Sequence, residues 1–136
     1  MRVAINRCYG GFGLSHAAVM RYAELIGLTL YPFMSWLEGG KIMCRPYVAG
    51  DDDPQYATRP LNEDRSYTNG SYWEFDTLSA SMRHDPALLQ VIDELGDKVN
   101  GRNALIKVVE IPDLVLYTIS DSNGFEAIHE VHRTWA

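Results

Sequence analysis

The chain has 136 residues, a formal net charge of −6 at pH 7 and two cysteines. This length predicts a single domain spanning residues 1–136, the acidic balance argues against non-specific nucleic-acid binding, and two cysteines are too few for a disulfide framework. The sequence has no apolar run of about 20 residues and no secretory signal, so we expect an intracellular protein with no membrane partner.

The first predicted elements are a short buried strand over Arg2 to Ile5 and a helix over Ser15 to Ile26. The helix has an apolar face with the spacing i, i+3, i+4, i+7, formed by Val19, Tyr22, Ala23 and Ile26. Ser15 is the expected N-cap, because its hydroxyl can accept a hydrogen bond from a free amide of the first turn. The glycine-rich segment that precedes Ser15 is therefore expected beside the helix N-terminus.

The middle of the chain carries weaker signals. Residues 29–36 and 41–48 favour extended structure, and the proline in the first of them indicates either an extended segment or a strand at a sheet edge. Residues 68–71, Thr-Asn-Gly-Ser, predict a tight hairpin turn. We interpret residues 50–82 as an irregular insertion or lid, in which the aspartate run 51–53 faces solvent because it lacks the ligand spacing of a calcium loop.

The second helix has the clearest signals. Asp85 is its predicted N-cap, Pro86 fills the first helical position, and Asn100-Gly101 ends it. Its apolar face consists of Leu88, Val91, Ile92, Leu95 and Val99.

The last third of the chain predicts strands. Residues 104–111 form one, and residues 115–119 and 125–131 form a C-terminal β-hairpin. The order of elements predicts an α/β (α+β) fold with a mixed β-sheet, two main helices and this hairpin.

Three glycines, Gly10, Gly11 and Gly13, stand before the first helix. A helix N-terminus presents unpaired amides with partial positive charge, and glycines let an anion approach the backbone. The known nucleotide-binding fingerprints do not fit, because a dinucleotide loop needs glycine at the position of His16 and no Gly-Lys-Ser/Thr sequence is present. The alternative is a tight strand-to-helix turn in which glycine has a steric role.

Cys8 lies close to the same helix start, with Arg7 and His16 near it in sequence. This setting lowers a thiol pKa and permits a nucleophilic role. The spacing fits no cysteine-enzyme signature, however, so a packed apolar thiol is the favoured interpretation. His129 and His132 face opposite sides of a strand, and we expect neither a metal site nor a cofactor.

Arginine and aromatic residues share the irregular segments: Arg59, Arg65 and Arg83 with Tyr56, Tyr67, Tyr72 and Trp73. Such side chains can clamp a phosphate and stack a base, and the same composition suits a protein–protein hot spot or a solvated loop. Near the C-terminus, Trp135 suggests an anchor, and Arg133 is then able to project toward a pocket.

Three stretches, INRCYGGFGLSHAAV, RHDPALLQVIDELGDKVNGRNALIKVVEIPD and the closing HRTW, resemble a family of small, mostly uncharacterised phage and prophage proteins. The resemblance covers residues 1–27 and 83–135, whereas residues 28–82 are individual to this chain. It implies a viral origin and directs attention to Asn6–Gly13 and Arg133–Trp135, but it implies no catalytic residue.

The leading hypothesis is a phage accessory protein, in the cytoplasm of the infected bacterial host, that binds and sequesters a small phosphorylated, nucleotide-type ligand without turning it over. A signal made by a host defence system is one such ligand. A homo-oligomer is expected, because a site shared between subunits can enclose a ligand that one small domain cannot. The predicted ligand-binding residues are Asn6, Arg7, Cys8, Tyr9, Gly10, Gly11, Phe12, Gly13, Ser15, Arg83 and Arg133.

Three alternatives stay open. The first is an interaction protein whose aromatic middle segment inhibits a host defence enzyme. The second is a small hydrolase or transferase that uses Cys8 or a histidine, which is less favoured because no acid–base partner can be assigned. The third is a structural component of the virion.

Overall fold

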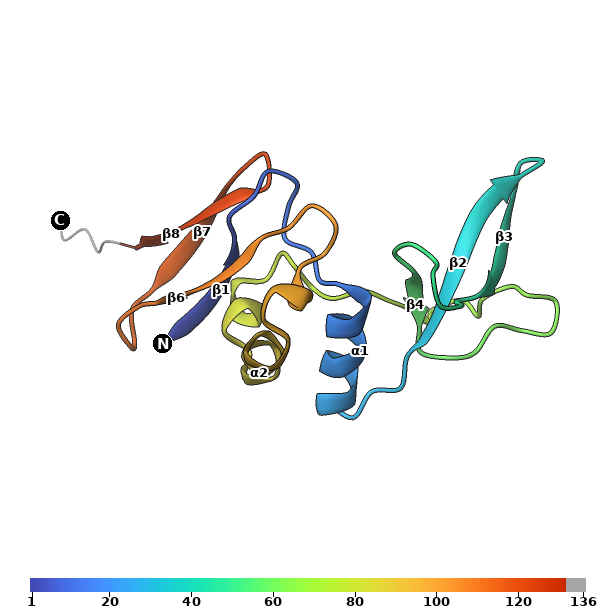
Figure 1. The fold of residues 1–136 in the computed structure, drawn as a ribbon, viewed down its shortest axis with the longest axis horizontal. Helices are drawn as coiled ribbons and strands as arrows, with labels where there is room; N and C mark the ends of the chain where they lie inside the picture. Colours follow the sequence, from blue (N-terminus) through green and yellow to red (C-terminus); the bar gives the residue numbers. More distant parts are fainter. Residues whose placement is uncertain (132–136) are drawn as a thin grey trace. The chain divides into compact units, whose positions relative to one another are not determined.

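The computed structural model describes residues 1–131 (Figure 1). The chain forms two compact units. Unit 1 contains Met1–Tyr22 and the described residues from Asp76 onward, and unit 2 contains Ala23–Phe75. The two sequence segments of unit 1 are therefore separated by the whole of unit 2.

Unit 1 pairs its strands antiparallel, β1 with β6 and β7 with β8. The strands are β1 (Arg2–Asn6), β6 (Ile106–Glu110), β7 (Tyr117–Ser122) and β8 (Phe125–Glu130). The helices are α1 (His16–Leu25), which belongs to this unit up to Tyr22, the 3-10 helix η1 (Ala80–His84), α2 (Pro86–Leu95) and the 3-10 helix η2 (Gly96–Val99).

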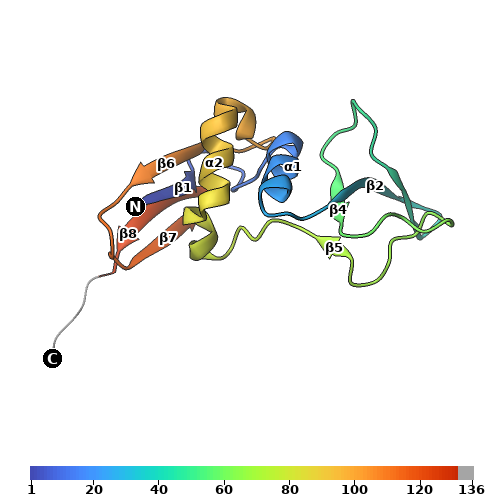
Figure 2. The ribbon, with the colours of Figure 1, turned by 90° about the horizontal axis from the view of Figure 1, so that it is seen from below.

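Helix α2 begins where its capping residues predict it but ends earlier than predicted, at Leu95 with Gly96 as its C-cap, and residues 96–99 form the separate 3-10 helix η2 instead of continuing to Asn100-Gly101. The Asp85 side chain accepts a hydrogen bond from the Ala87 amide at 3.2 Å, and Pro86 opens the helix. α2 lies over one face of the strands of its unit (Figure 2). The largest fully buried apolar side chains come from β1, α2 and η2, and they are Val3, Leu88, Val91 and Val99.

Unit 2 contains a four-stranded antiparallel sheet in the order β3-β2-β4-β5. Its strands are β2 (Tyr31–Glu38), β3 (Lys41–Pro46), β4 (Gln55–Ala57) and β5 (Tyr72–Trp73). One hydrophobic cluster of this unit consists of Phe33, Cys44 and Ala57, with Leu61 packed against them, and Leu30 and Tyr56 are also buried.

The α+β class, the two main helices and the C-terminal β-hairpin are confirmed. In place of one mixed sheet, residues 1–131 form three sheets, and their strand pairs are antiparallel. The turn at 68–71 is present, with the Ser71 amide 3.0 Å from the Thr68 carbonyl. It does not join two hairpin strands, because Tyr67 lies outside any strand and β5 pairs with β4.

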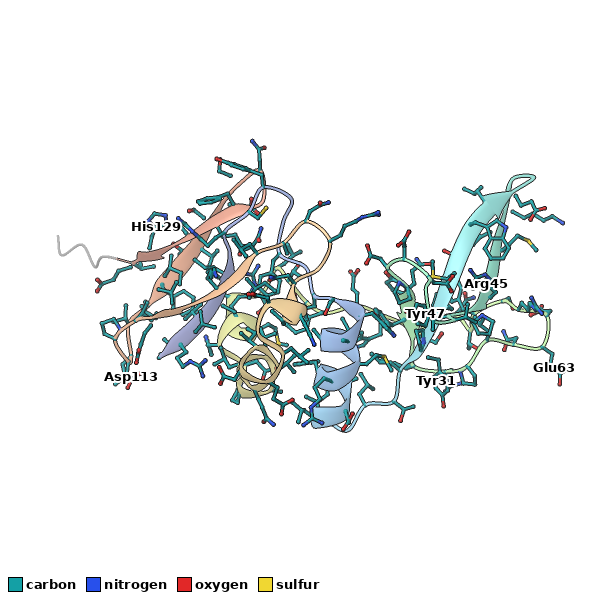
Figure 3. The ribbon with its side chains drawn as sticks, in the orientation of Figure 1. Tyr31, Arg45, Tyr47, Glu63, Asp113 and His129 are labelled. Carbon is teal, nitrogen blue, oxygen red and sulfur yellow. The ribbon has the colours of Figure 1, made fainter. Side chains whose placement is uncertain are left out.

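The aspartate run 51–53 was predicted to face solvent, and this prediction is wrong for its first residue, Asp51. The Asp51 carboxylate accepts two hydrogen bonds of 2.7 Å from the guanidinium of Arg45, which is labelled in Figure 3. It also accepts a third hydrogen bond of 2.9 Å from the Val48 amide. These bonds, that from Arg45 first, lower the pKa of Asp51 to about 2, whereas Asp52 and Asp53 are exposed as predicted.

Candidate functional site

Ser15 caps helix α1 as predicted. Its Oγ accepts a hydrogen bond from the Ala18 amide at 3.2 Å and donates to the Lys98 carbonyl at 2.6 Å. Its own amide donates to the Val99 carbonyl at 2.9 Å. The polar groups of Ser15 therefore hold the helix start against η2.

The glycine segment is packed closely against other loops of unit 1. A Cβ at Gly10 would lie 2.5 Å from the Cβ of Asn103, and a Cβ at Gly124 would lie 2.1 Å from the Gly11 amide. The Gly13 carbonyl accepts a hydrogen bond from the Gly101 amide at 2.8 Å. These contacts supply a steric reason for Gly10 and for Gly124, whereas a Cβ at Gly11 would meet no atom within 4 Å.

Asn6 is buried at the end of β1 and uses its side chain to hold two loops. Its Nδ2 donates to the carbonyls of Cys8 and Gly124, both at 2.6 Å. Its Oδ1 accepts from the Leu105 amide at 2.8 Å. Asn6 therefore positions the glycine segment beside the β7–β8 turn.

Arg83 is buried and ion-paired, which the sequence did not indicate. Its Nη1 lies 2.6 Å from Oε1 of Glu126, its Nη2 lies 2.8 Å from Oε2, and both side chains are almost fully buried. The Phe12 ring covers the guanidinium, whose central carbon lies 3.8 Å from the ring centroid. The charge of Arg83 is thus offset within the protein.

Arg7 and Tyr9 meet at the surface on the ring of Phe125. The Arg7 guanidinium carbon lies 4.0 Å from the Phe125 centroid, and the Tyr9 and Phe125 centroids are 5.3 Å apart. Tyr9 is 69% exposed, and Cys8 between them is half-buried. The structure thus brings together the predicted residues from Asn6 to Gly13, while Arg133 lies outside the described residues.

An aromatic pocket lies in unit 2, on one face of the β2–β3 hairpin. Its volume is about 280 Å³. The hairpin contributes Phe33, Ser35, Ile42 and Cys44, and the remaining lining residues are Gln55, Tyr67 and Tyr72. None of these side chains carries a formal charge at neutral pH, so the pocket favours a neutral, planar group.

The rings and polar groups of the aromatic pocket are arranged for such a group. Phe33 and Tyr67 stack with centroids 6.1 Å apart and ring planes 22° apart. The Ser35 hydroxyl donates to Oε1 of Gln55. Burial, followed by the charge of Glu74, raises the pKa of Tyr72, so its hydroxyl keeps its proton, which it donates to the Glu74 carboxylate at 3.5 Å.

The other predicted aromatic and arginine residues of unit 2 are outside the pocket lining. Tyr56 and Trp73 pack edge to face with centroids 6.3 Å apart. Arg59 and Arg65 are exposed. Of the predicted arginine and aromatic group, Tyr67 and Tyr72 line the pocket. Phe33 and Gln55 were not predicted, because their pairing across β2 and β4 leaves no local signal in the sequence.

The described residues contain no group of three or more histidine, cysteine or acidic side chains placed to bind a metal ion. His129, labelled in Figure 3, instead lies 2.9 Å from the Ser120 hydroxyl through Nε2. No helix among residues 1–131 has the length and apolar character needed to cross a membrane.

Comparison with known proteins gives no assignment: the chain matches no protein-family model, no curated protein sequence and no solved structure. The candidate site therefore rests on its geometry.

Proposed function

We propose that the protein binds and sequesters a small nucleotide-type ligand, whose base enters the aromatic pocket of unit 2. The observation that carries this proposal is an uncharged pocket of about 280 Å³ with a stacked pair of rings, Phe33 and Tyr67. Stacking of one base on an aromatic side chain contributes about 1–3 kcal/mol and tolerates any base.

Polar groups in the same pocket suit the edge of a base. The Gln55 amide combines a donor and an acceptor, the pattern that binds adenine through two hydrogen bonds. The Ser35 hydroxyl donates to Gln55 and the Tyr72 hydroxyl to Glu74, so each can serve a ligand as an acceptor. Arg59 and Arg65, exposed in the same unit, are the proposed phosphate contacts, because guanidinium groups bind phosphate oxygens through paired hydrogen bonds.

Binding without turnover fits the chemistry of the pocket. Its one thiol is Cys44, and burial raises the pKa of that thiol, which disfavours the nucleophilic thiolate. The resemblance to phage proteins supports a role in the cytoplasm of an infected bacterium, with a defence signal as the ligand. Enclosure of the phosphates by a second copy of the chain is part of this proposal.

The test is calorimetric titration with adenosine monophosphate, adenosine and inorganic phosphate. Tyr67→Leu is expected to weaken nucleotide binding by about tenfold or more, since it removes the stacking surface. Tyr31→Leu is the matched control, because Tyr31 and Tyr67 are both 39% exposed and Tyr31 does not line the pocket. Nucleotide recovered intact after denaturation of the protein is the expected sign of sequestration.

Two outcomes would contradict this proposal. Absence of heat and of any rise in melting temperature with all three probes would exclude the ligand class. Binding that survives Tyr67→Leu but is lost in Gly11→Val would move the site to the glycine segment of unit 1. Light scattering with and without nucleotide tests the proposed oligomer.

A second candidate function is inhibition of a host protein, and the tip of the β2–β3 hairpin favours it. Leu37 and Ile42 are direct cross-strand partners and are 73% and 67% exposed. Trp36 and Met43, the next pair, are also exposed. Exposed apolar patches mark interaction surfaces. A host protein that co-purifies with the wild type and with Tyr67→Leu, but not with Leu37→Ser, would support inhibition over sequestration.

A further inference from the structure

We propose a second binding site, in unit 1, that takes a neutral, single-ring cyclic amide. The site is a cavity of about 190 Å³ between the segment before η1 and the β7–β8 hairpin. Arg83 and Glu126 form part of its wall. The inference does not depend on the aromatic pocket of unit 2, because no residue is shared between the two cavities.

One hydrogen-bond donor in this cavity wall has no acceptor. A guanidinium has five N–H donors in one plane. In Arg83, Nη1 donates hydrogen bonds to Glu126 and to the Ala4 carbonyl, and Nη2 donates to Glu126 and to the Thr77 carbonyl. The fifth donor, Nε, is buried and has no partner among residues 1–131.

The direction of the unpaired donor follows from the planar shape of the guanidinium. In a planar guanidinium, Nε–H points to the same side as Nη2, and Nη2 donates to the carbonyl of Thr77 at 2.8 Å. Thr77 lines the cavity. A buried N–H without an acceptor is costly, so an acceptor atom of a ligand placed here gains a hydrogen bond that the protein alone does not make.

The charges of the cavity wall select against an anion. Arg83 contributes one positive charge, whereas Glu126 and Asp121 each contribute a negative one. The Arg83 charge is already offset by Glu126 at 2.6 Å. An added phosphate would meet the exposed carboxylate of Asp121 without a free cation to balance it, and this opposes the anionic ligand predicted for Arg83.

A cyclic amide matches the donors and acceptors of the wall. Its carbonyl oxygen accepts from Nε of Arg83, and its adjacent N–H donates to the Asp121 carboxylate. One Asp121 oxygen already accepts from the Gly124 amide at 2.6 Å, which leaves the second oxygen, Oδ2, for the ligand. The amide edge of a lactam presents this acceptor and donor side by side.

The volume and the apolar lining residues of the cavity fit a ligand with a single ring. A cavity of about 150 Å³ holds one benzene molecule, so a volume of about 190 Å³ fits one ring and not a whole nucleotide. Leu78 lines the cavity and is 96% exposed, and Ile119 lines it from the hairpin. The Asp76 carboxylate accepts hydrogen bonds from the Leu78 and Ser79 amides, and these bonds fix the turn that carries Leu78. A bound ring would cover this side chain.

The test follows the Nε–H resonance of Arg83 by ¹⁵N NMR during titration of the full chain with uracil. Uracil is expected to shift this resonance with a dissociation constant of about 1 mM, as for a ligand of few atoms. 1,3-Dimethyluracil keeps both carbonyls but lacks N–H groups, and it is expected to bind at least about tenfold more weakly. D-ribose and inorganic phosphate are expected to leave the resonance unmoved.

A pair of variants tests the role of Asp121. Asp121→Asn keeps the side-chain oxygen that caps the β7–β8 turn and removes the carboxylate, so uracil affinity is expected to fall about tenfold. Glu130→Gln removes an equal charge from β8 outside the cavity lining, and it is expected to have no effect.

Three results would overturn the proposal. The first is an Nε–H resonance that uracil does not move, as expected if water alone fills the cavity. The second is a larger shift with phosphate or ribose than with uracil, which would contradict the ligand class. The third is an equal affinity of the wild-type protein for uracil and for 1,3-dimethyluracil. This comparison uses the wild type alone and so does not depend on the folding of a variant.

Discussion

Glu126 connects several segments of unit 1 through hydrogen bonds, although the sequence around it does not indicate such a role. Its carboxylate accepts hydrogen bonds from the Asn6 amide at 2.7 Å and from both terminal nitrogens of Arg83, and its carbonyl accepts from Arg7 at 2.8 Å. Three parts of the chain, β1, η1 and β8, therefore meet at one side chain.

Glu126→Gln is expected to lower the free energy of unfolding by about 3–5 kcal/mol, because it leaves the Arg83 cation buried without its counter-charge. Urea denaturation measures the change. The double variant Arg83→Met/Glu126→Leu should recover much of the loss, since an apolar pair can replace a buried ion pair. A double variant no more stable than Glu126→Gln would contradict this explanation.

Gly124 and Gly11 permit a matched test of the close loop packing. Their φ angles are +90° and +93°, but only a Cβ at Gly124 would meet another backbone, 2.1 Å from the Gly11 amide. Gly124→Ala is therefore expected to destabilise the protein by about 1–3 kcal/mol more than Gly11→Ala. Thermal unfolding of the two variants measures the difference in stability. An equal loss of stability in both variants would mean that backbone strain alone explains the effect and that the close packing does not contribute.

The sequence predicts roles for single residues only where the partner is near in the chain. Ser15 was identified as a cap because its acceptor role is defined within one helical turn. The partner of Arg83 lies 43 residues away, on a strand whose alternating pattern gives no sign that Glu126 is buried. Arg83 was therefore expected to be free to bind phosphate, and the structure shows it paired.

At the scale of secondary-structure elements, the helices were predictable and the short strands were not. Helix α2 has an N-cap, a proline at its first position and a continuous apolar face. β4 has three residues and β5 has two, too few for any periodicity to be read. β4 pairs with β2 and β5 pairs with β4, so both strands depend on pairing partners that are present only in the assembled sheet.

Helices α1 and α2 are joined by an exposed ion pair that gives a pH prediction. Hydrogen bonds from Arg21 and then from Gln90 lower the pKa of Glu94 to about 2, below the ordinary value of 4.5. A carboxyl group with a depressed pKa stabilises the fold above its unfolded pKa, and this contribution is lost as the pH falls. Wild-type stability should therefore decline between pH 4.5 and pH 2.

Glu94→Gln is expected to make this decline shallower, because the variant has no carboxylate to protonate at that position. The melting temperature, followed by circular dichroism across the acid range, checks the expectation. Glu130→Gln serves as the control for loss of one negative charge. Parallel pH profiles for Glu94→Gln and the wild type would show that the pair does not contribute.

At the scale of the whole molecule, the two units differ in how much they bury. The largest fully buried side chains of residues 1–131 come from β1, α2 and η2 of unit 1, whereas the buried cluster of unit 2 contains Phe33, Cys44 and Ala57 with Leu61 beside them. Regions with few buried apolar contacts open more easily. Amides of β2 and β4 are expected to exchange at least about tenfold faster than those of β1 and β6, which equals about 1.4 kcal/mol.

Hydrogen exchange detected by mass spectrometry or NMR measures this difference. Equal protection of the two sets of strands would mean that the whole chain opens as one cooperative unit. The same experiment with adenosine monophosphate reports on function, because a ligand in the aromatic pocket should slow exchange in β2 and leave β6 unchanged.

The pairing of β1 with β6 also has a consequence for biosynthesis. Residue 2 lies opposite residue 110, so β1 leaves the ribosome well before its pairing partner β6 has been translated. During that interval all of residues 23–75 have already emerged and are able to fold, while the apolar side of β1 stays uncovered. A nascent chain stalled before residue 106 should consequently be a better substrate for chaperones and proteases than the full chain, in which β6 covers β1.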